Sequence, residues 1–174
     1  MRKLLVFCIF VFFGCLEITG TLHAASKSVT IRSLASIKDT LELAVSQAGQ
    51  SDLRFGNILS TSTPVEIGPL TVIIHVTSNT GERYQVTQLL NGPLQNANND
   101  QLGVENLKFK SSSTRSAGTV VSSPLTASTS AQTIFISDSA GDSDTLSVEY
   151  TLTVPPSQAP GDYSTLLTYT VSVL

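Results

Sequence analysis

The sequence is poor in the residue types that most often perform chemistry. Its 174 residues include two cysteines, two histidines and no tryptophan. Cys8 and Cys15 both lie in the first fifteen residues, and beyond the N-terminal segment His75 is the single histidine. This composition excludes a disulfide or a thiol nucleophile in the remaining chain, and it excludes a zinc site of the usual cysteine and histidine ligands.

Charge is also scarce, at 13% of all residues. Arg2, Lys3 and Glu17 belong to the N-terminal segment, which leaves 8 basic and 12 acidic residues for the rest of the chain. Without a basic stripe, nucleic acid is excluded as an expected partner. The abundance of serine and threonine suits the solvent-facing side of β-sheets.

The N-terminus is typical of a secretory signal peptide. Arg2 and Lys3 precede an unbroken run of ten apolar residues at positions 4–13. This run is too short for a membrane-spanning helix, which needs about 20 residues, but it matches the apolar region of a signal peptide. With cleavage near Ala25, residues 1–25 are predicted to be removed and the protein to be exported to the periplasm, the cell surface or the extracellular medium.

Cys15 supports a second interpretation of the same segment. It follows Gly14 directly at the end of the apolar run, as the acceptor cysteine of a lipoprotein does. Lipidation there would anchor the protein to a membrane, and this is the only route by which a membrane is expected as a partner. Phe12 stands where lipoprotein signals favour leucine, and the two interpretations remain open.

The rest of the chain is predicted to be all-β. Short segments with alternating apolar residues are separated by glycine, proline and asparagine, which is typical of a sandwich or barrel. We predict a single domain over residues 37–174, an immunoglobulin-like or jelly-roll β-sandwich of about seven to nine antiparallel strands. The expected strands include segments 41–45, 53–59, 70–78, 84–90, 107–110, 119–121, 131–137, 146–154 and 163–174.

Three features of the expected arrangement are specific. Segment 70–78 is apolar on both faces and is predicted to lie in the middle of a sheet. Segment 84–90 is predicted to pair with it as a hairpin, because Asn79, Thr80 and Gly81 form a tight connection. Segments 146–154 and 163–174 are predicted to form an antiparallel pair across a short loop.

No catalytic constellation is evident in the sequence. A Ser–His–acid triad would need His75 in a cleft, and its place in an apolar strand favours a structural histidine instead. Glu149 alternates onto the face opposite Tyr150, so it is expected to face solvent and not an opposed carboxylate. Phosphate-binding glycine motifs are absent. The protein is therefore predicted to be neither an enzyme nor a cofactor carrier.

One acidic segment is a candidate metal site. Asp138, Asp142 and Asp144 cluster around Gly141, and carboxylates in a tight turn are hard oxygen ligands for calcium. The spacing does not match an EF-hand. The alternative is a solvated turn in which the aspartates bind local backbone amides.

Several segments resemble the spore coat U and archaic-pilus subunit families. The resemblance is carried by an early Phe-Gly pair, a tyrosine-bearing strand after the central strand, and a closing Pro-Gly-x-Tyr strand. The matching residues are Phe55, Gly56, Tyr84, Pro160, Gly161 and Tyr163. The family's disulfide near the Phe-Gly strand is missing here. The resemblance implies an incomplete sandwich that a strand from another subunit completes, with a periplasmic chaperone assisting assembly.

Residues 26–36 form an N-terminal extension that supplies a candidate donor strand. Within residues 26–34, Val29 and Ile31 alternate with polar neighbours, as a strand that fills an apolar groove would. The alternatives are a disordered leader and a first strand that pairs within its own chain. We therefore predict a non-enzymatic surface or structural subunit that assembles with identical or related subunits by strand exchange. The alternative function is an extracellular adhesion or carbohydrate-binding module.

Overall fold

The computed structural model describes residues 35–47 and 53–174. The chain divides into two units, Met1–Ser36 and Ile37–Leu174, and the strands described below belong to the second unit. The predicted signal peptide at 1–25 and nearly all of the extension at 26–36 lie outside the described residues. In the described part there is no α-helix, and the all-β prediction is confirmed.

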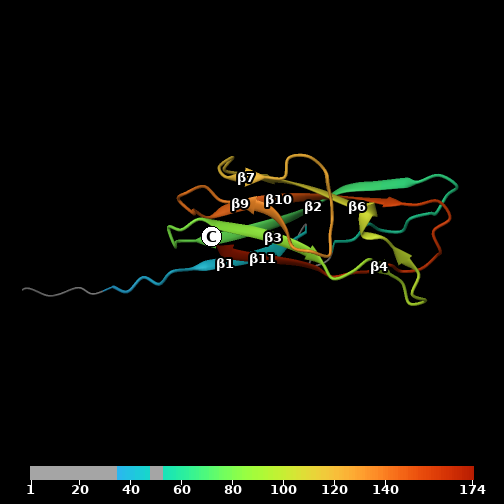
Figure 1. The fold of residues 1–174 in the computed structure, drawn as a ribbon, viewed down its shortest axis with the longest axis horizontal. Coiled ribbons are helices and arrows are strands. Elements are labelled where there is room, and N and C mark those ends of the chain that lie inside the picture. Colours follow the sequence, from blue (N-terminus) through green and yellow to red (C-terminus); the bar gives the residue numbers. More distant parts are fainter. Residues whose placement is uncertain (1–34, 48–52) are drawn as a thin grey trace, which may run out of the picture. The chain divides into compact units, whose positions relative to one another are not determined.

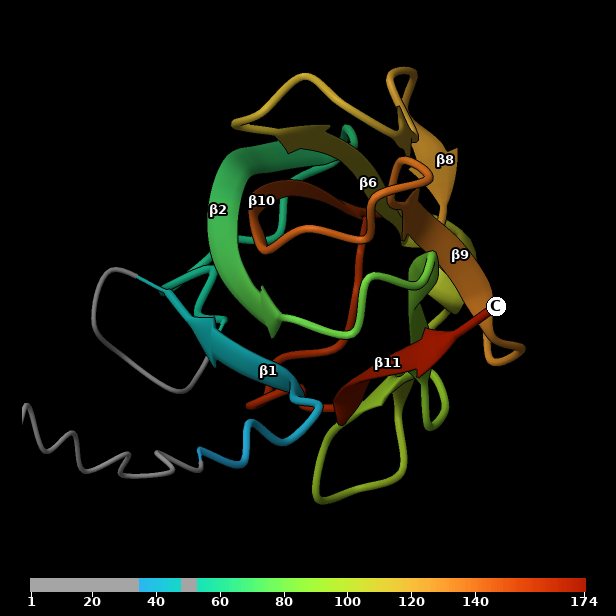
Figure 2. The ribbon, with the colours of Figure 1, turned by 90° about the vertical axis from the view of Figure 1, so that its left-hand side faces the viewer.

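The larger of two main sheets has five strands, and Figures 1 and 2 label its longer members. Their order is β1 (Leu41–Ser46), β2 (Val65–Ser78), β10 (Asp144–Val154), β6 (Leu107–Ser113) and β8 (Leu125–Thr126). All neighbours in this sheet are antiparallel. The apolar β2 lies between β1 and β10, which confirms the predicted interior strand.

The second main sheet has four strands, in the order β11 (Leu167–Val173), β3 (Tyr84–Leu90), β9 (Gln132–Ile136) and β7 (Thr119–Val120). Two minor strands, β4 (Leu94–Gln95) and β5 (Gln101–Leu102), form a separate ribbon that precedes a short 3₁₀ helix, η1 (Val104–Asn106). The structure thus has more strands than predicted, because four of them contain only two residues.

The core follows directly from the alternation of side chains along each strand. In β10 every second residue from Asp144 to Val154 is buried, and Leu146, Val148 and Tyr150 have no exposed surface. The facing strand β3 alternates in the same way. Burial of one large apolar side chain contributes about 1.5–3 kcal/mol, so these two inner faces stabilise the sandwich.

Three details of the sequence prediction were wrong. Strands β2 and β3 are not a hairpin, because β2 pairs with β1 and β10 whereas β3 pairs with β11 and β9. Likewise β10 and β11 belong to different sheets. The connections from β2 to β3 and from β10 to β11 each cross from one sheet to the other. The two strands of each pair therefore face each other across the core and do not pair within one sheet.

The third error concerns residues 53–59, which form no strand. Their apolar side chains Leu53, Phe55 and Ile58 are only partly buried and pack against the edge of the core. Gly56 has a φ of +77°, a left-handed conformation that interrupts an extended strand.

Candidate functional site

The register between β6 and β10 places four polar side chains together on the outer face of the five-stranded sheet. Ser147 lies opposite Ser112, and Glu149 lies opposite Lys110. Because side chains two residues apart share one face of a strand, these two pairs are neighbours on the solvent side. The Lys110 Nζ and Glu149 Oε2 atoms are 3.0 Å apart and form an ion pair.

These residues line a shallow cavity of about 230 Å³, which we call the β6–β10 cavity. Its other wall comes from residues 120–122, where the carbonyl oxygen of Val121 accepts a hydrogen bond from the Ser111 amide at 2.7 Å. The lining residues are Lys110, Ser111, Ser112, Val120, Ser122, Ser147 and Glu149. Ligand sites commonly measure about 300–1,000 Å³, so this cavity suits one small ring more than a large cofactor.

The serine residues of the cavity differ in whether their hydroxyl groups already form hydrogen bonds within the protein. Ser111 is buried, donates to the carbonyl oxygen of Ile134 at 2.6 Å and accepts from the Val121 amide at 2.9 Å. It ties β6 to the second sheet and to the cavity wall. The hydroxyls of Ser112, Ser122 and Ser147 have no hydrogen-bond partner within the described residues. Three hydroxyl groups and one ion pair are therefore available to form hydrogen bonds with a ligand.

His75 lies on the same outer face, one row further along. It is exposed on β2, and its Nδ1 atom is 3.0 Å from the hydroxyl oxygen of Thr145, its cross-strand neighbour. No carboxylate hydrogen-bonds to its ring among the residues that the structure describes. This arrangement is that of a surface histidine in a sheet, in agreement with the interpretation from sequence.

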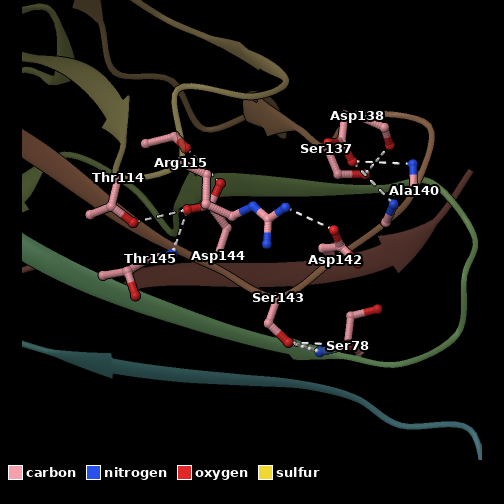
Figure 3. A network of polar contacts seen from close by, with 12 residues as sticks. Ser78, Thr114, Arg115, Ser137, Asp138, Ala140, Asp142, Ser143, Asp144 and Thr145 are labelled. Carbon is pink, nitrogen blue, oxygen red and sulfur yellow. Dashed lines mark hydrogen bonds and ion pairs between the residues drawn. The ribbon is translucent and has the colours of Figure 1, made fainter.

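The three candidate calcium ligands do not converge on one point, as Figure 3 shows. Asp138 accepts hydrogen bonds from the amides of Ala140 and Gly141, each at 3.2 Å. Asp142 forms an ion pair with Arg115 at 2.8 Å. Each carboxylate is thus engaged by its own partner.

Asp144 is the buried member of the group. Its carboxylate accepts from the hydroxyls of Ser113 and Thr114, at 2.5 and 3.2 Å, and from the Thr145 amide at 2.7 Å. The part of the chain that the structure covers contains no group of three or more histidine, cysteine, aspartate or glutamate residues that could hold a metal ion. Asp138 binds local backbone amides, as the alternative interpretation expects, whereas Asp142 and Asp144 are held by side chains 27 to 31 residues away in the sequence.

The candidate donor-strand residues Val29 and Ile31, and the candidate lipidation site Cys15, lie outside the described residues.

The β6–β10 cavity was not predicted from the sequence. Glu149 was predicted only to face solvent, and no functional role was predicted for Lys110 or Ser147. Alternation along each strand could have placed their side chains outward, but the pairing of β6 with β10 depends on a register that residue order does not reveal.

Comparisons with known proteins assign no family to the chain. No family model matches it, and no curated protein matches it. Among solved structures, it is similar to a family 123 glycoside hydrolase from Clostridium perfringens that was described for glycolipid glycan hydrolysis. The TM-score is 0.43 at 13% identity, and the match covers 78% of this chain and 25% of that one.

This comparison corrects the predicted function. A non-enzymatic pilus- or coat-like subunit assembling by strand exchange was expected, whereas the solved structure found to be similar is a glycoside hydrolase. The subunit hypothesis is therefore not carried further, and so low a similarity assigns no activity in its place. The resemblance to the spore coat U family is untested and stays a prediction.

Within the described residues, no helix has the length and apolar character needed to span a membrane.

Proposed function

We propose that this chain is an exported binding module whose β6–β10 cavity takes a neutral, hydroxyl-rich ligand such as a sugar ring of a glycan. The observation that carries the proposal is the set of polar groups in the cavity, where Ser112, Ser122 and Ser147 surround the Lys110–Glu149 pair. Sugar hydroxyls both donate and accept hydrogen bonds, and this lining supplies both kinds of partner.

The charges in the cavity favour a neutral ligand. Lys110 and Glu149 compensate each other at 3.0 Å, so that the site carries no net charge that would select an anion or a cation. The carboxylate of Glu149 can accept from ligand hydroxyls, and the ammonium group of Lys110 can donate to ring or hydroxyl oxygens. Hydrogen bonds to charged groups contribute about 1.5–3 kcal/mol each, more than those between neutral groups.

The proposal is for binding and not for hydrolysis. Most glycosidases require two carboxyl groups on opposite sides of the scissile bond, one as acid and the other as base or nucleophile. Glu149 is the single acidic residue among those that line the cavity, and its partner is a lysine. Glu149 is also paired with a cation at a solvent-open site, and not set in the apolar pocket typical of a glycosidase's general acid.

The test uses the full mature chain on an array of neutral and acidic oligosaccharides, followed by titration calorimetry with the neutral ligands that bind. We expect E149Q to weaken binding about 10- to 100-fold, because a charged acceptor is lost. S147A should weaken it less, by about tenfold or under. Both positions are on the surface, so circular dichroism should show an unchanged fold.

The matched control is T170V on β11, whose residue lies on the outer face of the other sheet. This variant also replaces an exposed polar side chain in a strand, and it should bind as the unmodified chain does. The proposal would be overturned by an array without any glycan signal. It would equally be overturned by binding that E149Q and S147A leave intact, since a ligand would then lie elsewhere.

A further inference from the structure

Within the second unit, Ile37–Leu174, the longest segment that contains no charged side chain is residues 116–137. The segment begins after Arg115 and ends before Asp138, and it is rich in serine, threonine and alanine. It contributes β7 to the edge of the four-stranded sheet and β8 to the edge of the five-stranded sheet. One uncharged segment therefore supplies an edge strand to each layer, and Figure 2 shows β8 at the periphery.

The middle of this segment exposes several hydroxyl groups that the fold does not use. Ser123, Thr126, Thr129 and Ser130 are all exposed. None of these four hydroxyl groups has a hydrogen-bond partner within the described residues. By contrast, the hydroxyl of Ser128 is only partly exposed and accepts from the Ser130 amide at 3.0 Å. Pro124 is exposed beside Ser123 and interrupts the regular backbone between β7 and β8.

Exposed edge strands invite pairing with the edges of other molecules. Proteins usually prevent this with charged side chains, prolines or short strands at the edge. Here the edge strands are short and Pro124 is present, but charge is absent throughout residues 116–137. A bulky, hydrophilic group attached to the edge would add to the protection that the short strands and Pro124 already give. Serine- and threonine-rich segments with proline are the composition that carries such groups as O-linked glycans.

We infer that the loop around β8 is an O-glycosylation site, with Ser123, Thr126, Thr129 and Ser130 as acceptors. The co-substrate is an activated sugar linked to a nucleotide or lipid phosphate, used by a separate glycosyltransferase. The acceptor oxygen forms a bond to the anomeric carbon while the bond from that carbon to the phosphate breaks. The phosphate leaves with the electron pair, and the hydroxyl proton passes to a base of the transferase.

The experiment compares the exported protein from the organism that encodes it with the same chain made in a host without protein O-glycosylation. Cleavage after arginine and before aspartate releases residues 116–137 as a single peptide, because neither Lys, Arg nor Asp occurs within it. We expect this peptide from the native source to carry the added mass of one or more whole sugar residues. Alkaline β-elimination should remove that mass.

Two variants expressed in the native organism locate the site. S123A/T126A/T129A/S130A should lose the sugars, and T168A/T170A, with exposed threonines on β11, should keep them. An unmodified 116–137 peptide from the native source would overturn the inference, as would sugars that persist in the fourfold variant. The readout is mass, so the outcome is independent of whether the β6–β10 cavity binds a glycan.

Discussion

The hydroxyl oxygens of Tyr150 and Tyr169 lie 2.6 Å apart, which joins β10 of one sheet to β11 of the other through the interior of the sandwich. Tyr150 also donates a hydrogen bond to the side-chain oxygen of Gln88 on β3, and Gln88 is 1% exposed. Tyr169 is therefore the donor to Tyr150. Three polar side chains from three strands form one chain of hydrogen bonds in a largely apolar core.

Removal of the central hydroxyl should be the most damaging change to this chain of hydrogen bonds. In Y150F, Gln88 loses the partner of its oxygen, and its amide nitrogen already has none among the described residues. We expect the free energy of unfolding to fall by about 1–3 kcal/mol, since a buried polar group is left unsatisfied. Urea denaturation followed by circular dichroism measures this value.

Y169F is the matched control, because it leaves the bond from Tyr150 to Gln88 in place. It should cost about 0.5–1.5 kcal/mol, the net value of one hydrogen bond. A loss in Y169F that equals or exceeds the loss in Y150F would contradict the assigned direction of the hydrogen bonds.

Alkaline pH should destabilise the sandwich through its buried phenols. Burial raises the pKa of Tyr84 to about 12, and the nearby charges of Asp144 and Asp138 act in the same direction. Burial likewise raises the pKa values of Tyr150 and Tyr169. Since the ordinary value is about 10, the folded state holds these protons more tightly than the unfolded chain.

The resulting stability is fully present below pH 10 and is lost as the pH rises through about 12. Melting temperatures measured at intervals from neutral pH to pH 12 should fall across this window, with tyrosinate absorbance rising as the fold is lost. Y84F removes one of the groups and should make the decline shallower. A melting temperature that is flat to pH 12 would show that the phenols are accessible to solvent.

Gly141 is required in the turn before β10. Its φ is +60°, and a Cβ atom there would overlap the carbonyl oxygen of Glu82. Gly81 has a similar φ of +67° but open space around it. G81A should therefore cost only the left-handed strain of about 1–2 kcal/mol. G141A should cost about 1–3 kcal/mol more, because the backbone must also move.

Chemical denaturation of the two alanine variants separates the steric cost from the conformational cost. Equal losses of stability in G81A and G141A would mean that the turn and residue 82 are not in contact in solution.

Calcium should not stabilise the acidic turn. Asp138, Asp142 and Asp144 each bind a different protein partner, so an ion would have to break hydrogen bonds already made. Differential scanning fluorimetry with calcium at about 10 mM, above the range of about 0.1–1 mM typical of extracellular calcium modules, should show an unchanged melting temperature. A rise that D142N abolishes and that magnesium does not reproduce would restore the calcium site.

Much of the layer structure could be read from local patterns. The alternation in residues 146–154 predicts which side chains of β10 enter the core, and the structure buries them as expected. Segment 70–78 was predicted to lie inside a sheet, and β2 does lie between β1 and β10, although only its alternate residues Val72, Ile74 and Val76 are buried. The site could not be predicted from local patterns. Lys110 and Glu149 are separated by almost forty residues, and in the sequence each is an ordinary surface charge.

The sequence by itself determined the class of fold, because side-chain alternation and turn residues are local properties of the chain. The tertiary structure alone decided which strands are neighbours, and it separated β2 from β3 and β10 from β11 where chain proximity had favoured pairs. Strand pairing depends on how two apolar faces close over one core, a property of the whole chain. The same long-range register brought Ser112, Ser147 and the Lys110–Glu149 pair together, and kept the three aspartates apart.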